Sequence, residues 1–143
     1  MSQTYSPDLE IQPRTGLHIA LWGGQLLLAA LYAGAGFTKL TTPMAELPAM
    51  IPWTADVAEP LVRFIGASEL LASIGLLLPS ILKIQPKLSA LAAAGLTTVM
   101  ALASVFHLVR GEYAVIPLTA GLGSIAAFVA WGRAYGRPIP ARS

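Results

Sequence analysis

The chain has 143 residues, of which 55% are hydrophobic and 11% are charged. An ordinary soluble domain carries roughly 25% charged residues, and a mean hydropathy of +0.67 implies more apolar surface than such a domain exposes. These values exclude a soluble domain and indicate an integral membrane protein in contact with the lipid bilayer. The absence of cysteine excludes disulfides and thiolate metal sites. A net charge of +2 without a basic run argues against a nucleic-acid partner.

The spacing of the charged residues predicts the elements, because a bilayer core requires about 20 apolar residues for each helical span. Four apolar windows meet this requirement. We therefore predict an all-α fold, a transmembrane antiparallel four-helix bundle with a polar tail before it and a basic tail after it. The tails cover residues 1–15 and 134–143, the transmembrane domain covers 16–133, and the helices span about 16–40, 60–82, 88–110 and 113–133.

The connection 41–59 follows the first helix and is much longer than the other connections. Its residues Pro43, Pro48 and Pro52 exclude one continuous helix. Trp53 is typical of the headgroup layer of a bilayer. Two interpretations stay open: a linker that rests on lipid, or a lid over a cavity between the helix ends.

Glu69, in the second predicted helix, is the most informative polar residue of the apolar windows. A bare carboxylate is costly in hydrocarbon, so Glu69 should face the bundle and have a partner. A structural hydrogen bond between helices and a ligand or proton site are both compatible with this position. His107, near the end of the third helix, lies on a stripe that can turn towards Glu69, although a packed structural histidine is an equal alternative.

The nine basic residues orient the chain, because short cytoplasmic segments are enriched in lysine and arginine. Four spans place both termini on one side. That side carries six of the nine basic residues, namely Arg14, Lys83, Lys87, Arg133, Arg137 and Arg142, and the other side carries Lys39, Arg63 and Arg110. We therefore expect cytoplasmic termini and an extracytoplasmic loop 41–59. Taken singly, the three outer cations are explained by contact with headgroups; their convergence with Glu69 and His107 favours a site.

The sequence carries no self-sufficient catalytic motif, since GxSxG, P-loop and HExxH patterns are all missing. Its two histidines, His18 and His107, belong to opposite ends of the predicted bundle and cannot ligate one metal within a monomer. We expect no dedicated metal site and no covalent cofactor. Whether the chain is an enzyme stays open.

Several segments together resemble the DoxX-like family of small bacterial four-helix membrane proteins. They are AGAGFTKL at 33–40, RFIGASELLASIGLLLP at 63–79, AAAGLTTVMALASVFHLVRGE at 92–112 and the closing PLTAGLGSIAAFVAWGR. The resemblance implies a four-helix bundle in the bacterial cytoplasmic (inner) membrane. It also implies a link to quinone chemistry, because members of the broader family are associated with quinone-dependent thiosulfate oxidation, oxidative-stress complexes or catechol and quinone responses. Lys39, Arg63, Glu69 and His107 match the family's polar positions.

The leading hypothesis is a membrane protein that binds a lipophilic ligand, with a quinone as the candidate, near the extracytoplasmic helix ends as a redox-associated subunit. The candidate residues for ligand binding or proton exchange are Lys39, Arg63, Glu69, His107 and Arg110. The alternative is a structural or assembly subunit of a larger membrane enzyme, packed through glycine and alanine faces as a homo-oligomer or in a complex. A transporter is a third class, although four spans are short of the usual inverted repeats.

Overall fold

The computed structural model describes residues 12–142, and every regular element among them is helical. Four long helices carry most of this range: α1 (Gln12–Thr41), α3 (Glu59–Leu82), α4 (Lys87–Val109) and α5 (Ile116–Trp131). The short helices are α2 (Leu47–Met50), the 3₁₀ helices η2 (Pro52–Asp56) and η3 (Tyr113–Val115), and the π-helix η4 (Gly132–Gly136). The predicted all-α class is therefore confirmed.

Four segments are long and apolar enough to cross a membrane, as predicted: Thr15–Thr41, Glu59–Leu82, Lys87–Val109 and Tyr113–Gly136. Their bounds differ from the predicted ones mainly at the ends of the chain. α1 begins at Gln12 with Pro13 in its first turn, where a missing N–H is tolerated. The first part of the predicted polar tail, residues 1–11, lies outside the described residues, and the predicted basic tail begins inside η4.

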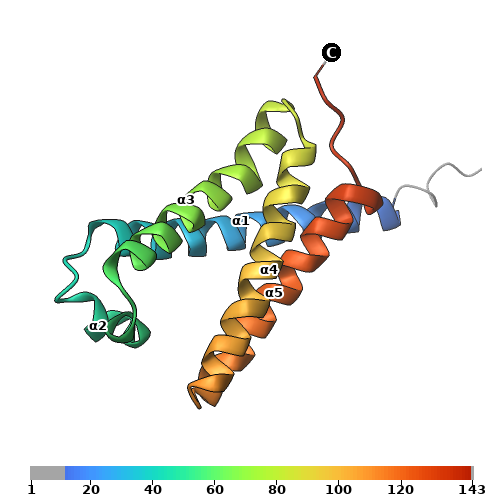
Figure 1. Ribbon diagram of the computed structural model, residues 1–143. Helices are drawn as coiled ribbons and strands as arrows, with labels where there is room; N and C mark the ends of the chain where they lie inside the picture. Colours follow the sequence, from blue (N-terminus) through green and yellow to red (C-terminus); the bar gives the residue numbers. More distant parts are fainter. Residues whose placement is uncertain (1–11, 143) are drawn as a thin grey trace, which may run out of the picture.

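The long helices associate as two pairs. α1 packs chiefly against α3, α4 packs chiefly against α5, and a smaller contact between α3 and α4 joins the pairs (Figure 1). In Figure 1 the pairs diverge from the turn between α3 and α4, with α2 at the far end of one pair. We call the end that carries α2, η2 and η3 the loop end, and the end that carries the α3–α4 turn and η4 the tail end. The antiparallel bundle and the extracytoplasmic position of the loop stay predictions.

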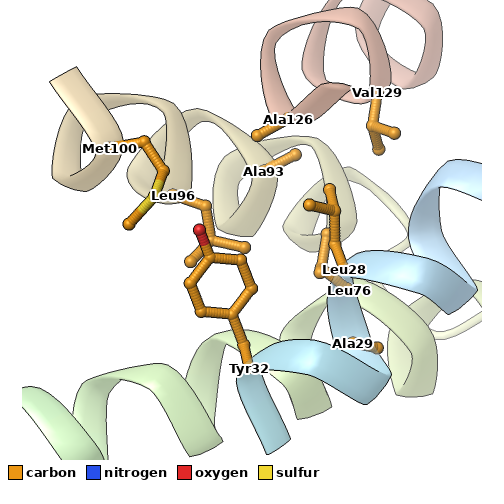
Figure 2. Close-up of a cluster of buried hydrophobic side chains, with 9 residues drawn as sticks. All are labelled: Leu28, Ala29, Tyr32, Leu76, Ala93, Leu96, Met100, Ala126 and Val129. Atoms are coloured by element: carbon orange, nitrogen blue, oxygen red, sulfur yellow. The ribbon is translucent and has the colours of Figure 1, made fainter. Parts of the chain in front are cut away.

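The core lies where the four long helices meet (Figure 2). Tyr32 of α1 points towards Leu96 and Met100 of α4, and Ala93 of α4 lies beside Ala126 of α5. The cluster consists of Leu28, Ala29, Tyr32, Leu76, Ala93, Leu96, Met100, Ala126 and Val129. It mixes large and small side chains, which lets the helices approach closely without a large aliphatic layer between them.

The outer face of the helices is apolar, whereas several fully buried positions are polar. Phe64, Leu71 and Leu91 are 67%, 69% and 67% exposed, while Gln25 and Ser89 are 0% exposed. Water would disfavour this distribution, and a hydrocarbon environment accommodates it. The structure therefore agrees with the composition in favouring lipid as the surroundings of α1, α3, α4 and α5.

Candidate functional site

A buried ion pair joins α1 to α3 near the loop end. Lys39 Nζ donates hydrogen bonds to Glu69 Oε1 at 3.0 Å and to Oε2 at 2.7 Å. Lys39 is only 5% exposed and Glu69 only 8% exposed. An unpaired charge at a buried position in an apolar span is costly, so each residue explains how the other is tolerated. Lys39 is thus the partner that the sequence analysis required for Glu69.

Two glycines set the distance between the helices at this pair. A Cβ atom on Gly36 of α1 would lie 2.6 Å from the carbonyl oxygen of Gly66 on α3. A Cβ atom on Gly66 would lie 2.8 Å from Lys39 Cβ. Real Cβ atoms do not approach backbone this closely, so only glycine permits the observed crossing. The glycines therefore bring Lys39 within reach of Glu69.

Arg63 holds the end of α1 against the start of α3. Its Nη1 donates to the carbonyl oxygens of Lys39 at 2.5 Å and Thr42 at 2.9 Å. Its Nε and Nη2 donate to Glu59 Oε1 at 3.1 Å and 2.9 Å. The last carbonyls of a helix lack partners within the helix, and Arg63 supplies them. Arg63 therefore caps the C-terminal end of α1.

A second polar cluster lies at the end of α4. His107 Nδ1 is 2.5 Å from Glu112 Oε2, and Arg110 Nε donates to Glu112 Oε1 at 2.8 Å. Arg110 Nη2 also donates to Asp56 Oδ2 of η2 at 2.7 Å. The partner of His107 is therefore Glu112, whereas the sequence analysis considered Glu69. Arg110 connects the loop between α1 and α3 to the end of α4.

These contacts shift the pKa values of the two charged groups that lie between α4 and η3. Hydrogen bonds from His107 and then from Arg110 lower the pKa of the Glu112 carboxyl below its ordinary value. Hydrogen bonds to Asp56 and then to Glu112 raise the pKa of Arg110. Both shifts favour the charged forms, so Arg110 and Glu112 are stabilised as an ion pair.

Aromatic contacts reinforce the attachment of η2 to α4. The Trp53 ring meets the Phe106 ring edge-on, with centroids 6.3 Å apart. Lys39 Nζ lies 6.0 Å from the centroid of the Trp53 ring, and the Arg110 guanidinium lies 5.3 Å from that of Phe106. Cations at these distances are attracted to the ring faces. Trp53 thus contacts Lys39 of the first polar cluster and Phe106, whose ring lies against Arg110 of the second.

A cavity of about 390 Å³ lies between these clusters. Lys39, Glu69 and His107 supply its charged or titratable side chains, while Trp53 and Val57 supply walls from the connection between α1 and α3. Most of the remaining lining is apolar and comes from α3 and α4, namely Leu61, Ile65, Val99, Met100, Leu102, Ala103 and Phe106, with Thr119 from α5. This volume falls within the range of small-molecule sites, about 300–1,000 Å³, and so does the apolar lining with few polar groups.

A neighbouring groove of about 280 Å³ extends the cavity along α3 and α4. Ile65, Glu69 and Val99 line both spaces. The groove is otherwise lined by apolar or small residues, among them Phe64, Ala72 and Leu96. A largely apolar cavity that carries Lys39, Glu69 and His107 therefore adjoins an apolar groove between α3 and α4.

The structure divides the five candidate residues into two groups. Lys39, Glu69 and His107 line the cavity, whereas Arg63 and Arg110 hold the surrounding segments in place. Asp56 could not be predicted as part of the site from the sequence, because it lies in the proline-rich connection and its partner Arg110 is distant in sequence. Within the connection, the only sequence feature that could have indicated a role for Asp56 was its position three residues after Trp53.

Metal ligands do not gather at this site. Within residues 12–142, no three side chains of histidine, aspartate or glutamate lie together in a way that could hold a metal ion. The chemistry of the cavity therefore rests on one lysine, one glutamate and one histidine.

The fold and the site define a class of protein: a small all-helical membrane protein with four helices capable of spanning a bilayer and, near one end, a largely apolar cavity that carries a few charged or titratable side chains. The DoxX-like family matches residues 24–129, and the chain belongs to this family. The matched range includes Lys39, Arg63, Glu69 and His107, and the resemblance seen in the sequence is confirmed. Comparisons with curated proteins and with solved structures give no match.

Proposed function

We propose that the protein binds a lipophilic ligand, with a quinone as the candidate, in the cavity beneath Trp53, as a subunit associated with a redox enzyme. The observation that carries this proposal is that Lys39, Glu69 and His107 line one cavity whose other walls are largely apolar. A quinone combines two polar oxygens with an apolar ring and tail. The ligand and the site therefore have the same division between polar and apolar parts.

The two polar clusters offer complementary hydrogen-bonding groups. A lysine ammonium carries three N–H donors, and Glu69 occupies two of those of Lys39. His107 Nδ1 faces the Glu112 carboxylate, so in a neutral ring Nε2 retains a lone pair that can accept a hydrogen bond. A quinone carbonyl can accept from Lys39, and a quinol hydroxyl can donate to His107. Both redox forms of the ligand would find a partner.

The groove along α3 and α4 supports a ligand with an apolar tail. It continues from the cavity past Ile65 and Val99 and has a volume of about 280 Å³. Phe64 at its edge is 67% exposed, so this channel adjoins the lipid-facing surface. We propose that the ligand enters from the bilayer by this route and that η2 acts as its lid.

The distribution of basic residues supports the sidedness of the proposal. The tail end carries Lys83, Lys87, Arg133 and Arg137, and cytoplasmic segments are enriched in such residues. We therefore place the tail end and both termini in the cytoplasm of a bacterial cell and the cavity near the outer face of the inner membrane.

A fluorescence titration tests the proposal with Trp53 as the reporter. Trp22 and Trp131 are replaced by phenylalanine, and decylubiquinone is added to the purified full-length protein in detergent. Quinones quench tryptophan fluorescence on contact, so a saturable decrease is expected. Replacing Ala103, which lines the cavity, by phenylalanine should abolish saturation because the added ring occupies the cavity.

Ala101→Phe is the matched control, because Ala101 lies on the same helix but is exposed. This variant should bind as the parent does. Glu69→Gln and His107→Ala should each weaken binding while helical circular dichroism is retained. Equal quenching in the Ala103→Phe and Ala101→Phe proteins would contradict the proposed location, and a linear decrease without saturation would contradict binding.

One observation favours the assembly subunit as a second candidate function. Gly23, Ala30 and Gly34 of α1 are exposed, and a Cβ atom on either glycine would meet nothing within 4 Å. Small residues of this kind permit close packing of another transmembrane helix. Replacing Gly34 by leucine should then disrupt a homo-oligomer or complex that is detected by native mass spectrometry. Retention of the assembly would argue against this face.

A further inference from the structure

A second polar region, unrelated to the cavity beneath Trp53, lies at the tail end. Its centre is Arg133 of η4, which is 4% exposed. Arg133 Nε donates to Gln25 Oε1 at 2.5 Å, and Nη1 donates to the Arg137 carbonyl oxygen at 3.3 Å. The guanidinium also lies 5.2 Å from the centroid of the Trp22 ring. Its three contacts are thus with an amide, a carbonyl and an indole, all of them uncharged groups.

No carboxylate among the described residues neutralises Arg133. The acidic residues of the described chain belong to the α1–α3 connection, to α3 as far as its middle and to the α4–η3 turn, and they are Glu46, Asp56, Glu59, Glu69 and Glu112. Four further basic residues, Lys83, Lys87, Arg137 and Arg142, lie at or beyond the helix ends on the tail side. A buried cation in an apolar protein usually has a counter-charge. The described part of the tail end supplies none.

Two buried nitrogen atoms near this centre have no hydrogen-bond partner among residues 12–142. They are Arg133 Nη2 and His18 Nδ1. His18 Nε2 accepts a hydrogen bond from Trp22 Nε1 at 3.1 Å, so in the neutral ring the proton resides on Nδ1. Both unpartnered atoms are therefore donors. Buried donors require acceptors, and Arg133 and His18 each line one of two neighbouring cavities.

The two adjoining cavities provide the space for an anion. The first, about 430 Å³, is lined by Arg133, Lys83, Lys87 and Arg142 among others. The second, about 810 Å³, is lined by His18, Trp22, Lys83 and Arg137. Lys83, Pro138 and Ile139 line both cavities. The backbone N–H of Arg142 donates to the Lys83 carbonyl oxygen at 2.8 Å, which holds the end of the chain beside them.

We propose that these tail-end cavities bind a phosphate-bearing anion, either the headgroup of an anionic lipid or free phosphate, with Arg133 as the central cation. Arginine binds phosphate strongly because several of its N–H groups can donate at once. Basic pockets between transmembrane helices on the cytoplasmic side are typical of headgroup sites. Leu17, Pro138 and Ile139 add apolar walls that suit the glycerol and acyl portions of a lipid.

Thermal unfolding of the full-length protein in a neutral detergent tests the proposal. Dioctanoylphosphatidylglycerol, dioctanoylphosphatidylcholine and sodium phosphate are titrated separately, with sodium chloride at matched ionic strength as the reference. An anionic headgroup should raise the melting temperature in a saturable manner, because ligands that bind only the folded state stabilise it. Saturation with phosphatidylglycerol alone assigns the site to a lipid, whereas saturation with sodium phosphate assigns it to the free ion.

The Arg133→Gln variant should bind about tenfold or more weakly, since one charge-assisted contact is lost. Arg133 is buried, so a second variant covers the case in which this protein does not fold. Lys83 and Arg137 are exposed, and the Lys83→Gln/Arg137→Gln protein should fold and bind about tenfold more weakly.

Arg63→Gln/Arg110→Gln is the matched control, because it also removes two cations, but from the opposite end of the helices. Its apparent affinity for the anion should equal that of the wild type. Two results would overturn the proposal: no saturable shift with either anion, or an equal loss of affinity in the Arg63→Gln/Arg110→Gln and Lys83→Gln/Arg137→Gln proteins. The absence of a saturable shift would mean that the cavities hold only water. An equal loss of affinity would mean that the anion responds to the net charge of the protein and not to the tail-end cavities.

Discussion

The ion pair between Lys39 and Glu69 leads to the sharpest prediction about stability. At 2.7 Å and an effective dielectric constant of about 20, the attraction is about 6 kcal/mol. Desolvation of both charges offsets much of it. Removing one partner leaves the other charge buried and unpaired, so Lys39→Met and Glu69→Leu should each lower the free energy of unfolding by about 3–5 kcal/mol.

The double variant Lys39→Met/Glu69→Leu should recover most of this loss. It leaves no unpaired charge and replaces the pair with apolar side chains of similar volume, an exchange that is often neutral. We expect its free energy of unfolding to lie within about 1 kcal/mol of the wild type. Titration of the purified proteins with sodium dodecyl sulfate in mixed micelles, followed by circular dichroism, measures all four stabilities.

The result that would refute this reasoning is additivity. If the double variant lost about as much stability as the two single variants together, Lys39 and Glu69 would contribute independently and the pair would not be the stabilising unit. The stable double variant also separates stability from ligand binding. It should fail to bind decylubiquinone, because it lacks two of the three charged or titratable side chains of the cavity, Lys39 and Glu69.

Three further predictions concern the surroundings of the site. Gly36→Ala should lower the free energy of unfolding by about 1–3 kcal/mol through overpacking. Gly34→Ala, whose Cβ meets open space, should leave it unchanged or raise it by up to about 1 kcal/mol, because alanine favours a helix over glycine; detergent titration compares the two variants, and equal effects would contradict a close helix crossing. Because the pKa of Glu112 is lowered from 4.5, its stabilising contribution is complete above that value and is lost as the pH falls through the lowered pKa. Melting temperatures between about pH 6 and about pH 3 should therefore depend less on pH in Glu112→Gln, and an unchanged profile would exclude this carboxyl. Asp56→Asn breaks an exposed ion pair with Arg110 and should speed amide hydrogen exchange in η2 by about 1.4- to 5-fold; unchanged exchange would show that aromatic contacts alone hold η2.

The sequence was sufficient to predict the helices, because their signal is local. Long apolar windows bounded by charges predict four spans, and the structure has them with small shifts at the ends. The fourth window is the exception: it divides into η3, α5 and η4. Pro117 lies in the first turn of α5 and lacks the N–H that would continue a helix from η3.

Partner choice at the site could be predicted only in part. The depth of Glu69 required a partner, yet three cations were predicted at the same end, and sequence distance did not distinguish among them. The Gly36–Gly66 crossing decides in favour of Lys39. Arg63 lies close to Glu69 in the sequence, but its guanidinium instead donates hydrogen bonds to the carbonyl oxygens at the end of α1.

The buried polar residues at the tail end were harder to anticipate. Gln25 is uncharged, so it does not interrupt an apolar window, and its contacts reach Ser80 of α3 and Arg133 of η4. A cation near the end of a span is usually explained by contact with headgroups. Only the tertiary arrangement shows that Arg133 is buried beneath Trp22 and the end of the chain.

In the described part of the chain, the basic residues are paired with carboxylates at the loop end, whereas Arg133 at the tail end is not, and this difference constrains the ligand that each end can bind. At the loop end, Lys39, Arg63 and Arg110 each form an ion pair with a carboxylate of the same chain. No described cation there is left to neutralise an anion, which favours an uncharged ligand such as a quinone in that cavity. At the tail end, Arg133 is buried without a carboxylate among the described residues. That end favours an anion, so we expect decylubiquinone and dioctanoylphosphatidylglycerol to bind to the same protein without competing.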